Sequence, residues 1–377
     1  MLDRYAQDLA SLAERGRLRA LAPRVGLDFA SNDYLALAES PELAAAAHAA
    51  LARGVPVGAG GSRLLRGNHP EHEALEEEAA RFFGAESALY FSAGFTANEA
   101  LLSTAPQRDD LILYDALAHA SVHEGMRLAR APNAPFRHND VGAAQDAIIA
   151  WRAKGGRGRL WIVVESLYSM DGDKAPLDDL HALAMQIDAF LVIDEAHATG
   201  VYGPHGRGLA ARFEGRGNVI TLHTCGKAMG VAGGLLCLPR LLRDFMINRC
   251  RPFIFATAPS PLVAACVRAA LKIVEGADDR RATLTSRVEF AGAALRRLCA
   301  IEPSGSQIQP IVVGSDIRAT TLASRLQAHG YDIRAIRPPT VPEGSARLRI
   351  ALTLNTSGED VAQMIAHLGE ELTRLET

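Results

Sequence analysis

Lysine is scarce in this chain of 377 residues, which has 40 lysines and arginines but only four lysines. They are Lys154, Lys174, Lys227 and Lys272. Lys227 differs from the rest because it lies in the apolar, glycine-rich segment 225–234. In such surroundings a lysine loses its proton near neutral pH and can act as an amine nucleophile, which arginine cannot. The alternative is a loop lysine that merely extends into solvent.

Several features that would point to other classes of protein are also missing. No apolar run approaches the roughly 20 residues of a membrane span, and the N-terminus shows no apolar signal segment, so we expect no membrane insertion and no export. The net charge of −3 gives no reason to expect a nucleic-acid partner. The five cysteines are odd in number and lack the close spacing of metal ligands. They favour free thiols in a reducing cytoplasm and no metal site.

The length favours two domains over a single core. Hydrophobic residues make up 48% and charged residues 22%, as in globular proteins. We expect an N-terminal helix and short strand over residues 1–40, packed with the small domain. A large cofactor-binding domain then covers residues 41–260, and a small α+β domain covers residues 261–377.

Short apolar runs alternate with helical patterns over the first two thirds of the chain. The predicted strands are 27–30, 88–91, 111–114, 160–164, 189–193, 219–222 and 234–238. The predicted helices are 3–20, one beginning at Ser40-Pro41, 70–83, one after the turn at 92–98, 178–187 and a pair within 261–300. Half-buried strands follow at 308–313, 331–336 and 347–352, with a helix between the first two and another at the end. Alternation of this kind is typical of an α/β protein with a mostly parallel, doubly wound sheet.

Asp194 follows the buried run 189–193, at the strand end where such sheets bind ligands. Together with a lysine, a carboxylate there suits pyridoxal phosphate, whose pyridine nitrogen must stay protonated. Glu195 is the weaker choice because side chains alternate along a strand. His197 could bond the phenolic oxygen of that cofactor. The alternatives are a helix cap for Asp194 and an ordinary loop histidine for His197.

Other candidate residues also fall just after predicted strand ends. The full set is Gly94, His119, Glu165, Ser169, Asp194, His197, Thr224 and Lys227. The turn at 92–98 could direct backbone N–H groups at a phosphate, or be a simple tight turn. His119 could stack on a flat cofactor or cap a helix. The glycine-rich segment 58–69 is a loop that could admit a ligand close to the backbone, and Arg349 could hold a carboxylate or be an exposed strand arginine.

Taken together, these motifs resemble the α-oxoamine synthases, a group of fold-type I pyridoxal-phosphate enzymes, from about residue 18 to the C-terminus. The segments that carry the resemblance are 31–35 (SNDYL), 165–173 (ESLYSMDGD), 194–200 (DEAHATG) and 224–227 (TCGK). Within the group, segments 58–69, 119–121 and 338–342 are most similar to the members of the biotin pathway.

The resemblance implies a role for each matched residue. Lys227 would form a Schiff base with the cofactor and move the substrate α-proton, Asp194 would pair with the pyridine nitrogen, and His119 would stack on the ring. The remaining cofactor contacts would come from Gly94, Phe95, Glu165, Ser169, His197, Thr224 and, from a second subunit, Thr257. Substrate groups would be held by Arg19, Asn32, His119, Thr340 and Arg349, with Arg349 on the amino-acid carboxylate.

The implied activity is a decarboxylative condensation of L-alanine with pimeloyl-CoA or a pimeloyl carrier protein, in a homodimer. Three alternatives remain open. Another α-oxoamine synthase would use glycine or serine with a different thioester. An aminotransferase would keep the lysine and the aspartate but release a keto acid. A binding module with a degenerate site would hold no cofactor.

Overall fold

The computed structural model describes residues 1–376, which form two compact units. The terminal unit comprises Met1–Tyr34, Met170–Asp173 and Ala282–Thr377, and the larger unit comprises Leu35–Ser169 and Lys174–Arg281. The domain boundary expected at residue 260 therefore falls inside the larger unit. The reason is α10 (Pro261–Glu275), which packs with Leu262 and Ala265 against Ala50 and Val55, at and just after the end of α2 (Pro41–Ala52).

The larger unit contains a seven-stranded sheet in the order β2-β8-β7-β6-β5-β3-β4. Its strands are β2 (Ser87–Phe91), β3 (Leu111–Asp115), β4 (Asn133–Phe136), β5 (Leu160–Glu165), β6 (Phe190–Asp194), β7 (Val219–Thr224) and β8 (Gly234–Leu238). Because β8 runs antiparallel to both of its neighbours and all other pairs are parallel, the other six strands share one direction. Their carboxyl ends therefore meet at one edge, as the predicted mostly parallel sheet requires.

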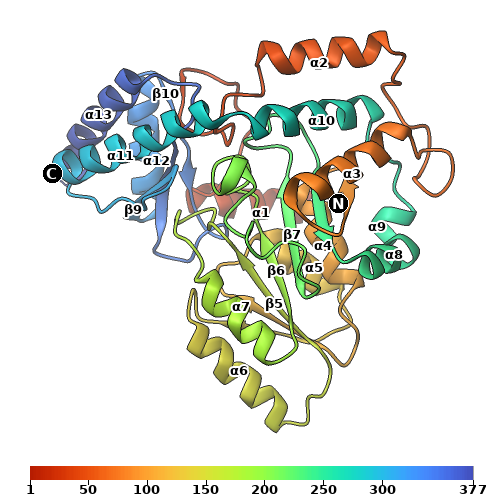
Figure 1. The fold of residues 1–377 in the computed structure, drawn as a ribbon. Coiled ribbons are helices and arrows are strands. Elements are labelled where there is room, and N and C mark those ends of the chain that lie inside the picture. The colour runs from red at the N-terminus through yellow and green to blue at the C-terminus, as the bar shows by residue number, and fades with distance from the viewer. Residues whose placement is uncertain (377) are drawn as a thin grey trace. The chain divides into compact units, whose positions relative to one another are not determined.

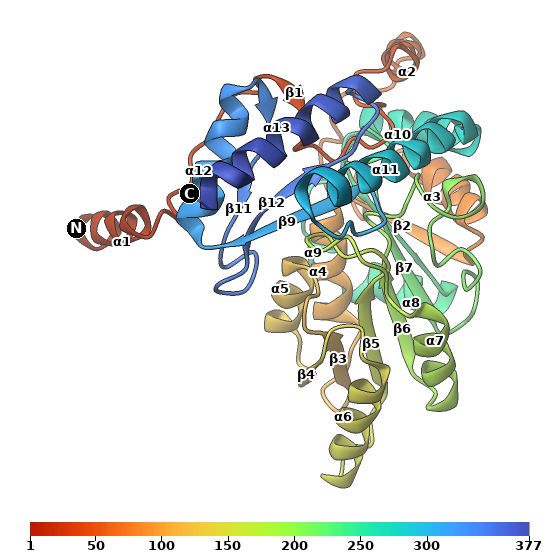
Figure 2. The same cartoon turned by 90° about the vertical axis from the view of Figure 1, so that its left-hand side faces the viewer.

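Helices cover both faces of this sheet, as Figures 1 and 2 show. The helices of the larger unit are α2 (Pro41–Ala52), α3 (Pro70–Phe83), α4 (Gly94–Thr104), α5 (Ala120–Leu128), α6 (Val141–Ala153), α7 (Leu177–Gln186), α8 (Arg240–Arg249), α9 (Arg251–Ile254) and α10, with a 3₁₀ turn at Pro204–Gly206. Along β6 the side chains alternate between two cores: Val192 joins the core of α4 and α5, whereas Leu191 and Ile193 join the core of α6 and α7. This double burial explains why the strands are almost wholly apolar.

The helix boundaries follow from local chemistry. At the start of α2 the Oγ atom of Ser40 accepts a hydrogen bond from the Leu43 N–H, and Pro41 occupies the first turn. At the end of α3, Gly84 takes a left-handed conformation with φ of 82°. Both boundaries confirm the prediction. β4 was not predicted, because its sequence Asn-Ala-Pro-Phe gives no apolar run.

The terminal unit contains α1 (Asp3–Glu14), most of α11 (Asp278–Cys299), α12 (Asp316–Ala328) and α13 (Gly358–Glu376). β11 (Ala335–Ile336), β12 (Ala346–Ala351) and β9 (Ile308–Gly314) form an antiparallel sheet, and β1 (Leu27–Asp28) pairs with β10 (Tyr331–Asp332). The single strand predicted at 331–336 is therefore wrong. Its two halves pair with different strands, and the chain bends at Ile333, whose N–H donates to the Tyr331 carbonyl.

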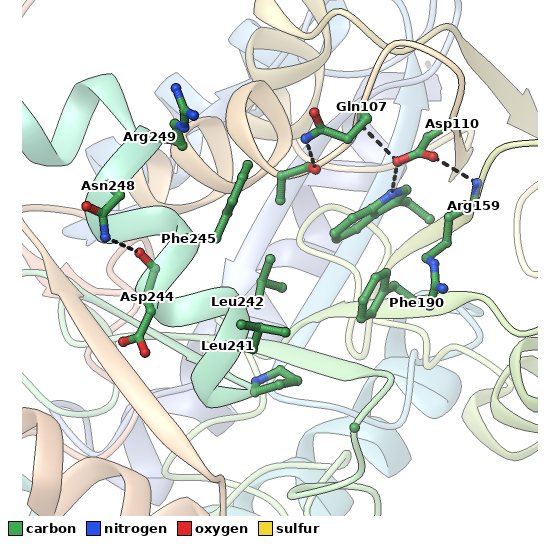
Figure 3. Close-up of a pocket in the computed structure, with 14 residues that line it drawn as sticks. Gln107, Asp110, Arg159, Phe190, Leu241, Leu242, Asp244, Phe245, Asn248 and Arg249 are labelled. Atoms are coloured by element: carbon green, nitrogen blue, oxygen red, sulfur yellow. Dashed lines mark hydrogen bonds between the residues drawn. The ribbon is translucent and has the colours of Figure 1, made fainter.

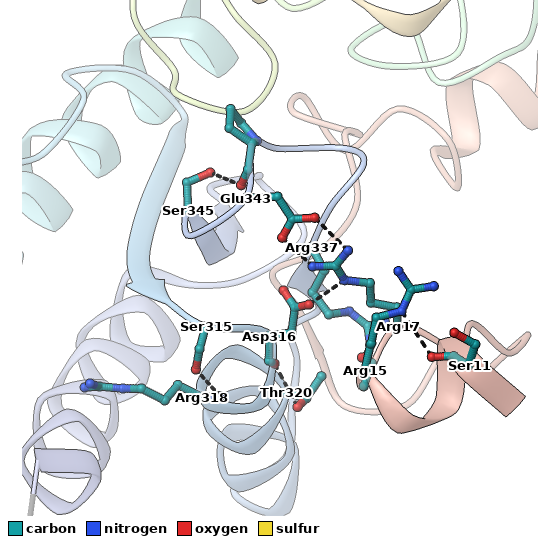
Figure 4. Close-up of polar contacts among 12 residues, drawn as sticks. Ser11, Arg15, Arg17, Ser315, Asp316, Arg318, Thr320, Arg337, Glu343 and Ser345 are labelled. Carbon is teal, nitrogen blue, oxygen red and sulfur yellow. Dashed lines mark hydrogen bonds and ion pairs between the residues drawn. The ribbon is translucent and has the colours of Figure 1, made fainter.

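The first helix is also shorter than the predicted 3–20, because Gly16 takes a φ of 67° two residues after α1 ends. The segment that follows is held within the terminal unit by Arg17 (Figure 4). Its Nε donates to Asp316 over 2.6 Å, and its two Nη atoms donate to the Glu343 carboxylate over 2.8 and 2.6 Å. Arg337 in turn donates to the Gly16 carbonyl. No helix of the described residues is long and apolar enough to cross a membrane.

Candidate functional site

Asp194 and Glu165 end the neighbouring strands β6 and β5 and lie opposite one another in the register. The side chain of Asp194 is buried, with Oδ2 accepting from the Asn98 Nδ2 over 2.7 Å and Oδ1 accepting from the Ala196 N–H over 2.9 Å. Glu195 turns to other partners and accepts from the N–H groups of residues 209 and 210. This is the alternation expected along a strand, and it leaves Asp194 beside Glu165.

Lys227 lies in the loop between β7 and β8. Its Nζ is 2.6 Å from Nε2 of His197, whose side chain is buried after the end of β6. The loop is closed by the Gly230 N–H, which donates to the Lys227 carbonyl over 2.8 Å. Gly230 approaches the backbone of residues 37 and 38 so closely that no side chain would fit there. The lysine is thus held on a fixed turn beside a buried imidazole.

Glu165 is 3% exposed and has one satisfied oxygen, Oε2, which accepts from the Ser169 N–H over 3.1 Å. Its other oxygen, Oε1, is buried without a hydrogen-bond partner among the described residues. Burial, with the Asp194 carboxylate as the next largest cause, raises the pKa of Glu165 to about 8. At neutral pH the group is mostly an uncharged acid with a hydrogen-bonding position left open.

His119 caps the start of α5 and is connected to Asp194 through two buried side chains. Its Nδ1 lies 2.8 Å from the Ser121 Oγ and accepts from the Ser121 N–H over 3.2 Å. The Asn98 Nδ2 donates to that same Oγ over 2.9 Å and also to Asp194. Burial is the largest cause that lowers the pKa of His119; Lys227 lowers it further and Asp194 opposes the shift.

The first turn of α4 lies against the end of β7. The residue before the helix, Ala93, makes no side-chain capping bond, so this helix start has no cap of its own. A Cβ atom on Gly94 would lie 3.3 Å from both Cβ and Oγ1 of Thr224, and a Cβ atom on Gly234 would lie 2.7 Å from the Gly94 Cα. Phe95 is half exposed, with its ring centroid 6.2 Å from that of His119. Glycine here allows the close approach, and an uncapped helix start suits a phosphate.

These groups fit the predicted cofactor on three observations. They offer a carboxylate fixed by two donors, a lysine on a fixed turn beside His197, and a helix N-terminus free of a side-chain cap next to a threonine hydroxyl. The open Oε1 of Glu165 marks a polar position that the described residues leave unfilled. The structure thus brings together in the larger unit Gly94, Phe95, His119, Glu165, Ser169, Asp194, His197, Thr224 and Lys227. Their roles toward a bound cofactor stay predictions.

The residues predicted to hold substrate belong to the terminal unit, except His119. There Arg349 and Asn32 are brought together, with the Arg349 Nη2 2.5 Å from the Asn32 Oδ1 and 3.3 Å from the Tyr34 hydroxyl. The Arg349 Nε is buried without a partner among the described residues. Arg19 and Thr340 are exposed. Thr257 is exposed in the larger unit, in the segment between α9 and α10.

Sequence reasoning missed the roles of Asn98, Ser121 and Tyr34 in these contacts. Asn98 lies four residues after Gly94, one turn further along α4. A polar residue at that spacing, next to the apolar Ala97, Ala100 and Leu101, was the available signal. No such signal marked Tyr34, because a tyrosine after a short strand is usually a core residue.

An apolar cavity of about 790 Å³ lies at the opposite edge of the sheet (Figure 3). One wall is α8, with Leu241, Leu242 and Phe245; the other includes Trp161 and Phe190, whose rings stack 4.4 Å apart. Since Trp161 and Phe190 stand at the starts of β5 and β6, this cavity is separate from the site at the strand ends.

Comparison with known proteins gives the family. The model of "aminotransferase class I and II" matches residues 24–368. The chain belongs to the aminotransferase class I and II family. Within this family it is 44% identical over 351 residues to an 8-amino-7-oxononanoate synthase of Burkholderia ambifaria, covering 91% of this chain and 73% of the relative. It is 40% identical to the same enzyme of an Azoarcus species, covering 100% of this chain and 98% of the relative.

Solved structures also share the fold of this chain. The serine palmitoyltransferase of Sphingomonas wittichii has a TM-score of 0.89 at 28% identity, covering 99% of this chain and 98% of that one. The 8-amino-7-oxononanoate synthase of Francisella tularensis has a TM-score of 0.79 at 27% identity, covering 93% and 99%. The predicted α/β fold of the fold-type I pyridoxal-phosphate enzymes is confirmed, and so is the predicted resemblance to an α-oxoamine synthase.

Proposed function

We propose that this chain is an 8-amino-7-oxononanoate synthase, which joins L-alanine to a pimeloyl thioester in biotin biosynthesis. The observation that carries the proposal is the meeting of Lys227, His197, Asp194 and Glu165 at the strand ends. Relatives that are 40–44% identical over 91–100% of this chain carry the name of this enzyme. In the overall reaction the α-carbon of alanine loses a proton and bonds to the acyl carbon. The thiol and CO2 leave, and a proton returns to the α-carbon.

Pyridoxal phosphate is the cofactor, and when bound it supplies an aldehyde for an amine and a ring that takes up electrons from the α-carbon. Asp194 would hold the pyridine nitrogen protonated, because its carboxylate is fixed by Asn98 and Ala196. The N–H groups at the start of α4, with Thr224, would bind the phosphate. Ser169 and His197 would contact the phenolic oxygen of the ring. The unpaired Oε1 of Glu165 lies at this same edge of the sheet.

Lys227 is the group we propose for proton movement at the substrate α-carbon. An amine suits this role only when it is uncharged, and its neighbours on the loop are apolar or glycine. Arg349 would hold the alanine carboxylate, since its Nε has no partner among the described residues and its Nη2 is already oriented by Asn32. Arg19, Asn32, His119 and Thr340 are proposed for the other substrate groups.

We propose that the enzyme works as a homodimer in which Thr257 contacts the phosphate bound by the partner subunit. The exposure of Thr257 supports this, because it leaves the hydroxyl accessible to a second chain. The acyl group would arrive on CoA or on an acyl carrier protein. The five cysteines are free thiols, which supports the cytoplasmic location that we propose.

The test is turnover by the purified enzyme with pyridoxal phosphate, over a panel of amino acids and thioesters. We expect CO2 and free thiol in equal amounts from alanine with pimeloyl-CoA, and much slower release with acetyl-CoA or palmitoyl-CoA. Serine with palmitoyl-CoA tests the alternative suggested by the serine palmitoyltransferase of similar fold. Faster turnover with that pair, or formation of a keto acid without CO2, would refute the proposal.

A further inference from the structure

Asn98 and Ser121 form a buried hydrogen-bonded connection between Asp194 and His119. Asn98 is 1% exposed and Ser121 is 0% exposed, so water does not compete for their hydrogen bonds. Both hydrogens of the Asn98 amide are used, one on Asp194 over 2.7 Å and one on the Ser121 hydroxyl over 2.9 Å. The amide cannot be reversed, because its oxygen would then face a carboxylate.

This connection determines which nitrogen of His119 carries a proton. The Ser121 hydroxyl accepts from Asn98 and lies 2.8 Å from the His119 Nδ1, to which it can donate its own hydrogen. The Ser121 N–H also donates to Nδ1, over 3.2 Å, and a backbone N–H is never an acceptor. Two donors therefore meet at Nδ1, which must present its lone pair. His119 is neutral, with its proton on Nε2.

We propose that Asn98 and Ser121 are positioning residues that keep His119 in the neutral Nε2–H form while fixing the Asp194 carboxylate. This proposal rests on the proposed function, in which His119 stacks on the cofactor ring. A neutral imidazole can stack on a protonated pyridine ring, whereas a second cation would be repelled. Asn98 acts on both groups at once, and Ser121 acts on His119 alone.

The charged groups that face His119 agree with this state. Asp194 favours an imidazolium, whereas Lys227, His123 and above all burial disfavour it. The two donors at Nδ1 add to the disfavouring side, since each bond made to the lone pair is lost on protonation. Loss of the Ser121 hydroxyl, or of the Asn98 amide that orients it, should therefore make His119 easier to protonate.

The test is nitrogen NMR of histidine-labelled protein, with the His119 signals assigned by their loss in His119→Gln. In the wild type we expect an unprotonated Nδ1 and a protonated Nε2, with and without pyridoxal phosphate. In Ser121→Ala and in Asn98→Ala the NMR titration midpoint of His119 should rise by about one pH unit, a tenfold gain in proton affinity. The matched control is Ser103→Ala, which removes a partly buried hydroxyl from α4 outside this connection and should change nothing.

Cofactor affinity gives a second readout. Asn98→Ala should weaken pyridoxal phosphate binding about five- to tenfold, because Asp194 loses a donor, and Ser121→Ala should weaken it less. A proton on Nδ1 in the wild type would overturn the proposal, and so would unchanged titration in Ser121→Ala, a mild change expected to fold. If the chain bound no cofactor, the proposed function would fail, while the NMR of the free protein would still decide the state of His119.

Discussion

Glu165 and Asp194 stand side by side at the ends of two parallel strands, where two buried carboxyl groups share one environment. Two negative charges on neighbouring buried carboxyl groups would repel each other and lose their hydration, so one of the groups keeps its proton. Asp194 receives two hydrogen bonds from donors, whereas Glu165 receives one and leaves an oxygen unpaired. The proton therefore stays on Glu165, whose pKa is raised to about 8.

The raised pKa of Glu165 predicts how stability depends on pH. The unfolded chain releases this proton near the ordinary value of 4.5, but the folded protein keeps it to about pH 8. The stabilising contribution is complete below pH 4.5 and is lost as pH rises through about 8. Glu165→Gln should remove this loss, so urea unfolding from pH 4.5 to 9 should give a flatter curve than the wild type. The control is Glu14→Gln on the exposed face of α1, and parallel curves for wild type and Glu165→Gln would contradict the prediction.

Arg349 should act on substrate binding and its neighbour Arg347 on stability. Arg349→Lys keeps the charge but loses the planar fork, so the KM for L-alanine should rise about tenfold or more, with a smaller change in kcat. Arg347, two residues earlier on β12, is buried and paired with Asp171. Arg347→Lys should therefore lower the melting temperature and leave the KM nearly unchanged. The same rise in KM in both variants would refute the assignment of Arg349.

Much of the larger unit could be predicted from the sequence because its strands are buried on both faces. Such strands appear as short apolar runs, and the six predicted runs all correspond to strands of the sheet. The polar residues after those runs could then be placed on one edge. β4 was not predicted because it lies at the edge of the sheet, where a strand can contain proline and polar residues in place of an apolar run.

The rest could not be predicted because it depends on long-range pairing. The halves of 331–336 separate because the first half pairs with β1, near the other end of the chain, whereas the second half pairs with the nearby β12. The contact of Asn98 with Asp194 spans 96 residues. Asp194 and Glu195 have different hydrogen-bond partners, as local alternation along a strand predicts. That Asp194 and not Glu195 pairs with the cofactor stays a prediction.

The scarcity of lysine allows a clean test of covalent cofactor binding. After incubation with pyridoxal phosphate and reduction with borohydride, we expect one cofactor per chain on Lys227, located by peptide mass spectrometry. Lys227→Arg should abolish the label and the visible absorbance, because a guanidinium forms no Schiff base. Lys272→Arg on α10 is the matched control and should keep both. Label on Lys174 or Lys272 in the wild type would contradict the assignment.

Substitutions at Gly54 and Gly84 should distinguish the energetic cost of backbone strain from that of steric crowding. Gly54 and Gly84 have φ of 80° and 82°, and a Cβ atom on Gly54 would meet nothing within 4 Å. A Cβ atom on Gly84 would collide with the guanidinium of Arg207, which donates to the Phe83 carbonyl. Gly54→Ala should cost about 1 kcal/mol of unfolding free energy from strain alone. Gly84→Ala should cost roughly 1 kcal/mol more, and equal losses in chemical denaturation would contradict this account.

The proposed role of Thr257 predicts recovery of activity on mixing two inactive variants. Lys227→Ala removes the amine, and Thr257→Asp places a carboxylate where the phosphate would bind, so each variant alone should be nearly inactive. If Thr257 serves the partner's site, a mixed dimer has one site with both defects and one with neither. Equal mixing with subunit exchange should then restore about one quarter of wild-type turnover, because half of the dimers are mixed and each has one intact site. If Thr257 served its own chain, both sites of a mixed dimer would carry one defect and no activity would return.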